Sequence, residues 1–292
     1  MDIIDAHHHV WDLAVRDQDW ITGPRLAPIR RDFSLADLAA DARRTPLRAS
    51  VLVQTVAAAE ETPEFLSLAA RGDLVAGVVG WTDLTAPDVA DRLAALREAP
   101  GGRHLVGIRH QVQAEPDPEW LLRPDVARGL TAVAAAGLVY DLVVLPHQLP
   151  ACAEAAAAHP ELTFVLDHLG KPGIAAGELS PWTAGLRALA ALPNTTAKLS
   201  GLVTEADWDA WTTADLRPYT EEALELYGPD RLMFGSDWPV CRLAASYETV
   251  LETARELTRH LAPTERAAVF STTALRVYGL DGLLPTPRPA AG

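Results

Sequence analysis

Three consecutive histidines, His7 to His9, lie near the start of the chain, directly after an apolar stretch. We expect residues 3–9 to form a β-strand, in which successive side chains point to opposite faces. His7 and His9 would then share one face with Asp5, and His8 would point to the other. Two neutral imidazoles on one face can hold a single divalent cation such as zinc. The alternative, a solvated histidine run or a tag remnant, is disfavoured because the run continues an apolar strand.

Asp237 is a further candidate ligand, in the stretch Phe234-Gly235-Ser236-Asp237-Trp238-Pro239 at the end of another apolar run. On its own, an aspartate at this place could equally cap the following loop or helix. It becomes a partner of the histidines only if the fold brings the two ends of the chain together. Two imidazoles and a carboxylate with one open position are typical of catalytic zinc or manganese.

Apolar strand-like segments and helix-like segments alternate along the 292 residues. The predicted strands cover residues 3–9, 50–56, 74–81, 105–111, 138–145, 162–168, 195–199 and 231–237. Helices are predicted from about residue 34 and over residues 58–70, 88–98, 125–136, 148–158, 182–192, 214–227, 247–260 and 264–278.

Eight strands, each followed by a helix, predict a parallel sheet closed into a single-domain (β/α)8 TIM barrel over residues 1–284. An open doubly wound sheet is the main alternative, and the lack of a GxGxxG motif after the first strand weakens its dinucleotide-binding version. Residues 285–292 are predicted to be a flexible Pro-rich tail.

Polar residues fall at the carboxyl ends of these strands, where the active sites of such barrels lie. They are Gln54, Arg109, His110, Asp141, His168, Lys171, Lys198 and Asp237. Burying so many ionisable groups is costly unless they pair or bind a ligand. Closure makes the first and eighth strands neighbours, so Asp237 should meet His7 and His9, with His168 as a fourth ligand or a proton carrier.

Composition limits the partners of the protein. The net charge is −14, so the sequence lacks the excess of basic residues expected of a nucleic-acid binder. It also shows no basic amphipathic face for binding an anionic membrane. No apolar run has the length of a membrane span, and no secretory signal is expected. The two cysteines, Cys152 and Cys241, are far apart, which favours a reducing cytoplasm over a disulfide framework. Ala- and Leu-rich helices leave a homodimer open.

Five motifs together resemble the amidohydrolase superfamily, and within it the branch of sugar-lactone hydrolases that includes L-fuconolactonases and L-rhamnonolactonases. They are Asp5-Ala6-His7-His8-His9-Val10-Trp11, Gly107-Ile108-Arg109-His110-Gln111, Val165-Leu166-Asp167-His168-Leu169-Gly170-Lys171-Pro172, Lys198-Leu199-Ser200-Gly201 and Phe234-Gly235-Ser236-Asp237-Trp238-Pro239. The resemblance extends to Leu280 and so covers nearly the whole chain. It is specific for the superfamily and much less specific for one sugar.

The resemblance implies hydrolysis of an aldonolactone, with one divalent metal held by His7, His9, Asp237 and His168. Zinc is expected, manganese is the alternative, and metal-independent catalysis is left open. Many amidohydrolases carry a bridging Lys or Glu on strand 4 and a metal-binding His on strand 5; Arg109-His110 and Asp141 stand there instead, which argues against a second metal.

Within this interpretation Asp237 is the general base and His168 a proton donor. The expected substrate-binding residues are Arg109, His110, Lys171, Gln54, Asp141 and Trp11. By alternation, only one of Arg109 and His110 need face the ligand. Lys198 either contacts substrate or pairs with Asp141, and Trp11, Trp81 and Trp238 either stack on a sugar or pack in the core.

Three alternatives remain. The chain could be a non-oxidative decarboxylase or a dicarboxylate lactonase of the same superfamily, or, in another class, a non-catalytic sugar-acid binding barrel.

Overall fold

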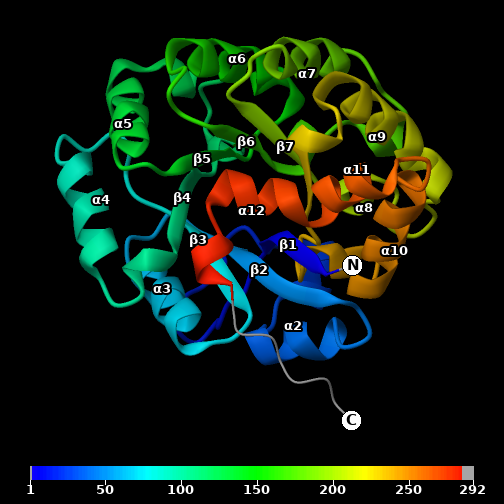
Figure 1. Ribbon diagram of the computed structural model, residues 1–292, viewed down its shortest axis with the longest axis horizontal. Helices are drawn as coiled ribbons and strands as arrows, with labels where there is room; N and C mark the ends of the chain where they lie inside the picture. The colour runs from blue at the N-terminus through cyan, green and yellow to red at the C-terminus, as the bar shows by residue number, and fades with distance from the viewer. Residues whose placement is uncertain (1, 285–292) are drawn as a thin grey trace.

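The computed structural model describes residues 2–284, which form a barrel of eight parallel strands surrounded by helices (Figure 1). The strands follow one another around the barrel in sequence order: β1 (Ile3–His8), β2 (Leu47–Val53), β3 (Val75–Gly80), β4 (Leu105–His110), β5 (Val139–Leu142), β6 (Phe164–Leu166), β7 (Thr195–Leu199) and β8 (Leu232–Phe234). The predicted single-domain (β/α)8 barrel is confirmed. The predicted tail at 285–292 lies outside the described residues, so the domain boundary at 284 stays a prediction.

The helices lie between and around the strands (Figure 1). They are α1 (Gly23–Leu26), α2 (Leu35–Asp41), α3 (Glu61–Arg71), α4 (Val89–Glu98), α5 (Pro124–Ala135), α6 (Leu149–Ala158), α7 (Trp182–Ala190), α8 (Leu202–Glu205), α9 (Thr213–Tyr227), α10 (Tyr247–Leu257), α11 (Pro263–Ala267) and α12 (Thr273–Tyr278). Two short helices, α1 and α8, were not predicted. The last predicted helix, 264–278, is divided by a π-helical turn at Ala268–Thr272.

Local sequence accounts for where several helices begin. Ser34 caps α2, since its hydroxyl accepts a hydrogen bond from the Asp37 N–H while the Asp37 carboxylate accepts one from the Ser34 N–H. Ser246 caps α10 by accepting from the Thr249 N–H. Such caps satisfy backbone N–H groups that have no partner inside the helix.

Strands β6 and β8 are shorter than predicted because the backbone leaves the extended region soon after each. His168 follows β6 with φ 53° and Asp237 follows β8 with φ 56°. A residue in the left-handed region cannot continue a strand. Each strand therefore ends two or three residues before a candidate site residue.

The ring closes between β1 and the residues that follow β8. The Asp237 N–H donates to the His7 carbonyl at 2.8 Å, and the His9 N–H donates to the Trp238 carbonyl at 2.7 Å. Gly235 allows this approach, since a Cβ there would lie 2.7 Å from the His7 Cβ. Closure thus places Asp237 beside the histidine run.

The amino-terminal half of the barrel interior is apolar. It is filled by strand residues that include Ile4, Ala6, Val51, Val53, Val79, Val165 and Met233. Helix α12 crosses this end of the barrel in Figure 1 and adds Ala274 and Tyr278, followed by Leu280. Within residues 2–284, no helix is both long and apolar enough to cross a membrane.

Candidate active site

Strand β1 contains a β-bulge that decides which side chains enter the barrel. Asp5 pairs with Ser50 and His8 pairs with Leu52, so three steps along β1 match two steps along β2. The extra residue breaks the alternation of side chains. As a result Asp5 shares a face with His8 and not, as predicted, with His7.

Asp5 instead supports the closure of the barrel from outside. Its carboxylate accepts hydrogen bonds from the His7 N–H at 3.1 Å and the Ser236 N–H at 2.8 Å. Burial raises the pKa of Asp5 to about 6. His8, whose pKa burial lowers to about 3, packs behind the sheet as predicted and stays neutral.

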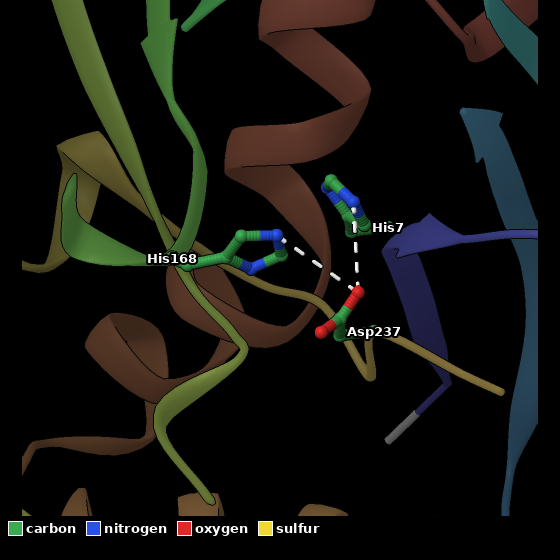
Figure 2. A group of neighbouring side chains, drawn as sticks. All are labelled: His7, His168 and Asp237. Carbon is green, nitrogen blue, oxygen red and sulfur yellow. Dashed lines mark ion pairs between the residues drawn. The ribbon is translucent and has the colours of Figure 1, made fainter. Parts of the chain in front are cut away.

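Asp237 lies at the centre of three imidazoles. Its Oδ1 atom is 3.5 Å from the Nε2 of His9, 3.8 Å from that of His7 and 3.9 Å from that of His168. Figure 2 shows His7 and His168 converging on this carboxylate from different elements. Burial alone would raise the pKa of Asp237, but the neighbouring His168 and His9 outweigh it and lower the pKa.

His168 reaches the centre because the chain turns sharply after β6. His168, Leu169, Gly170 and Lys171 all have positive φ angles, between 51° and 72°. The His168 ring packs against Gly201, where a Cβ would lie 2.5 Å from the ring Nδ1, so only glycine fits. Burial lowers the pKa of His168 to about 4, which makes the ring neutral at pH 7.

The other ring nitrogen of each histidine is held by the barrel wall. His9 Nδ1 lies 2.8 Å from the Val53 carbonyl, His7 Nδ1 lies 3.2 Å from Asp167 Oδ1, and His168 Nδ1 lies 2.9 Å from Ser200 Oγ. A carbonyl can only accept, so His9 Nδ1 carries a proton and donates it to Val53. Hydrogen bonds of this kind orient imidazoles toward metals in proteins.

This donor set fits one divalent metal. Ligand atoms of His7, His168 and Asp237 all lie within 4.8 Å of one another, and His9 Nε2 is 3.2 Å from His7 Nε2. Tetrahedral zinc with bonds of about 2 Å places its ligands roughly 3.3 Å apart, which is near these separations. Arg109 Nη1 lies 3.3 Å from His7 Nε2, so the guanidinium borders the same centre.

A buried ionic network lies beneath this centre. Lys198 Nζ is 2.5 Å from Asp141, 2.9 Å from Asp167 and 3.1 Å from His7 Nδ1. Arg109 donates to Asp167 at 2.9 Å. The network fixes the orientation of His7. Its two basic residues, Lys198 and Arg109, are both paired with carboxylates.

The network also sets the charge of its carboxylates. Burial alone would raise the pKa of Asp167, yet Lys198 and His7 hold it well below the ordinary value. Burial raises the pKa of Asp141 to about 6, against the opposing effect of Lys198. The Tyr278 hydroxyl, from α12, donates to Asp141 at 2.9 Å. Helix α12, which crosses the amino-terminal end of the barrel, therefore contacts the ionic network that lies beneath the site.

A cavity of about 130 Å³ opens onto the histidine–aspartate centre. Five of the predicted site residues line it, namely His9, Arg109, His168, Lys171 and Asp237. Its other lining residues are Trp20, Thr55, Gln111, Gln113, Val143 and Val240. Lys171 Nζ lies 3.6 Å from Glu205, a carboxylate whose pKa burial raises.

Four residues predicted to contact substrate lie elsewhere. His110 is on the outer face of β4, where it stacks on Trp120 at 4.3 Å and accepts a hydrogen bond from the Trp81 indole. Strand alternation explains this, since Arg109 takes the inward face. Asp141 is fully buried and paired with Lys198, which is the alternative left open from the sequence.

Gln54 and Trp11 are the other two. The Gln54 side-chain oxygen accepts from Arg109 Nε at 3.0 Å, so it orients that guanidinium. Trp11 is 5% exposed, donates to the Arg31 carbonyl and packs on Phe33. Both support residues around the cavity without lining it.

The six other cavity residues were not predicted from the sequence, namely Trp20, Thr55, Gln111, Gln113, Val143 and Val240. Gln111 follows Arg109 at a spacing of two, so strand alternation was an available signal. Trp20 lies in the long segment after β1, whose path no local pattern predicts.

Comparisons with known proteins show which family this chain belongs to. A model of the amidohydrolase family matches residues 4–280. An L-fucono-1,5-lactonase from Burkholderia multivorans is 42% identical over 298 residues, covering 98% of this chain and 97% of that protein. An L-fucono-1,5-lactonase from Burkholderia ambifaria is 38% identical over 282 residues, covering 95% and 96%. A crystal structure of an amidohydrolase from Burkholderia multivorans with bound zinc has 42% identity and a TM-score of 0.89, covering 96% of this chain and 100% of that one.

Proposed function

This chain belongs to the amidohydrolase family, and we propose that it hydrolyses the ring ester of a sugar-acid lactone. The observation that carries the proposal is the convergence of three imidazoles on the Asp237 carboxylate at the floor of a small polar cavity. Relatives named as L-fucono-1,5-lactonases, at 42% and 38% identity over nearly the whole chain, support the substrate class.

One divalent metal, zinc or alternatively manganese, is part of the proposal, with His7, His9, His168 and Asp237 as its ligands. A metal bound there would lower the pKa of a coordinated water and polarise the ester carbonyl. The chain's own contribution is the orientation of the imidazoles by Val53, Asp167 and Ser200.

Asp237 is the proposed general base. It accepts the proton of the water that attacks the lactone carbonyl carbon, while Arg109 and Lys171 donate hydrogen bonds to the substrate oxygens. When the ring C–O bond breaks, Asp237 returns that proton to the departing oxygen and the product is a hydroxy acid. Because burial keeps His168 neutral, we assign it to ligand or hydrogen-bond roles and not to a cationic proton donor.

The pairing of the cations favours a neutral sugar lactone over a dicarboxylate. Arg109 is already bound to Asp167 at 2.9 Å, and Lys171 lies 3.6 Å from Glu205. Neither is left to neutralise a second carboxylate of the substrate.

The experiment is a panel of aldonolactones followed with a pH indicator, before and after a chelator and after adding back Zn²⁺ or Mn²⁺. We expect acid release that the chelator abolishes and metal restores. Activity that survives complete metal removal would refute the role of the metal but not the lactonase activity. Acid release from no lactone would refute the lactonase, and carbon dioxide release with proton uptake from an aromatic acid would indicate a decarboxylase instead.

The cytoplasm stays the proposed compartment, supported by two free, buried cysteines. A homodimer and the absence of nucleic-acid partners also remain proposals. Gel filtration with light scattering tests the first, and a DNA-binding titration at low salt tests the second.

A further inference from the structure

We propose that Trp20 is the platform on which the substrate ring stacks, and that it selects lactones with one face rich in C–H groups. This inference rests on the proposed lactonase function. Among the described residues that line the cavity, Trp20 is the one Trp, Tyr or Phe, and its side chain is partly exposed. Trp11, expected from the sequence as a stacking residue, is buried in the core beside it.

The Trp20 indole is held in a defined orientation. Its Nε1–H donates to the Gln18 side-chain oxygen at 3.0 Å, and Gln18 is itself only 1% exposed. The Trp11 ring meets Trp20 edge to face, with centroids 5.7 Å apart and planes at 89°. The polar edge of the indole is therefore satisfied within the protein, and the part of its apolar surface that lines the cavity is available to a ligand.

Arg30 fixes the backbone on both sides of Trp20. Its guanidinium donates to the Ile21 carbonyl at 2.8 Å and the Gln18 carbonyl at 3.4 Å, and it pairs with Asp17 at 3.0 Å. The long segment after β1 therefore presents a pre-positioned ring, so a ligand would not have to order it on binding.

The rest of the cavity suggests which ligand suits that ring. Val143 and Val240 add further apolar surface, whereas the remaining lining residues are polar or charged. A volume of about 130 Å³ suits a single ring, since clefts for drug-sized ligands are roughly 300–1,000 Å³. The negative face of an indole attracts polarised C–H groups. A sugar lactone with hydroxyls on one face and C–H groups on the other matches both surfaces.

The test compares Trp20→Ala and Trp20→Phe with the wild-type protein on two lactones that are epimers at one ring carbon. Stacking acts equally on the bound substrate and the transition state, so KM should change and kcat should not. We expect Trp20→Ala to raise KM by about 10-fold with kcat within twofold, and to bring the ratio of kcat/KM for the two epimers close to one. Trp20→Phe should keep most of the wild-type preference.

Trp208→Ala is the matched control. Trp208 is also partly buried, in the segment after α8, and donates to the Thr204 carbonyl at 2.8 Å, but it does not line the cavity. Its KM and epimer ratio should equal those of the wild type. A folded Trp20→Ala variant with wild-type KM and wild-type epimer ratio would overturn the inference.

Failure of the lactonase proposal is a separate outcome. If the wild-type protein hydrolyses no lactone, calorimetric binding of the corresponding sugar acids still tests the ring platform. Weaker binding by Trp20→Ala, with Trp208→Ala unchanged, would support the platform, and equal binding by all three proteins would refute it.

Discussion

The amino-terminal end of the barrel interior is built mainly from Ala, Val, Ile, Met and Leu, whereas the carboxyl end holds two lysines, an arginine, three aspartates and three histidines. The backbone differs in the same way. In the part of the chain that the structure describes, the non-glycine residues with positive φ are His168, Leu169, Lys171 and Asp237, all at the carboxyl end. The left-handed region costs an ordinary residue about 1–2 kcal/mol. The amino-terminal end of the barrel thus contributes to the stability of the fold, whereas the carboxyl end holds functional groups in place at a cost in stability.

The largest expected effect is at the carboxyl end. Asp237→Asn removes the proposed base while keeping the size of the side chain, so kcat/KM should fall by about 10³-fold. Because the lowered pKa of Asp237 means that the folded protein favours its charged form, the melting temperature should fall slightly as well. Asp91→Asn, at an exposed position in α4, is the control and should leave both quantities unchanged. A variant that hydrolyses lactones at the wild-type rate would remove Asp237 from the mechanism.

The opposite end should respond in the opposite sense. Leu280 is fully buried in the apolar end of the interior, and Leu280→Ala leaves a cavity there. We expect the free energy of unfolding in urea to fall by about 3 kcal/mol, while kcat/KM at 25 °C stays within twofold. A parallel loss of activity in fully folded protein would show that the two ends are not independent.

Tyr278→Phe is expected to have the smallest effect. It tests the hydrogen bond between Tyr278, at the amino-terminal end, and Asp141, in the network under the site. Burial raises the pKa of Asp141 to about 6, above its ordinary value, so the stability contributed by this group is greatest below about pH 4 and is lost as pH rises through 6. The Tyr278 hydroxyl lowers that pKa, and Tyr278→Phe should extend the loss to higher pH. The variant should resemble wild type at pH 5 and be about 1.5 kcal/mol less stable at pH 8.

Urea unfolding at both pH values measures this difference. Tyr219→Phe is the matched control, because the Tyr219 hydroxyl donates to the Gly173 carbonyl at 3.5 Å and, within residues 2–284, to no carboxylate. A pH-independent difference for Tyr278→Phe would mean that Asp141 does not titrate in this range.

Much of this architecture was predictable because its signals are local. Apolar runs alternating with amphipathic segments indicate eight βα units, and the barrel rule then places His7, His9, His168 and Asp237 at one end. Strand alternation also predicts that only one of Arg109 and His110 faces inward. These inferences need only the spacing of residues within single segments.

What the tertiary structure decided depends on contacts between distant segments. The bulge that turns Asp5 outward arises from the register of β1 against β2. Asp141 pairs with Lys198 because their strands, β5 and β7, both direct these side chains into the barrel interior. Trp20 reaches the cavity because Arg30 and Gln18 fold the segment after β1 back over it. Register, cross-barrel pairing and loop path are set by packing among residues far apart in the chain, and no periodicity in the sequence encodes them.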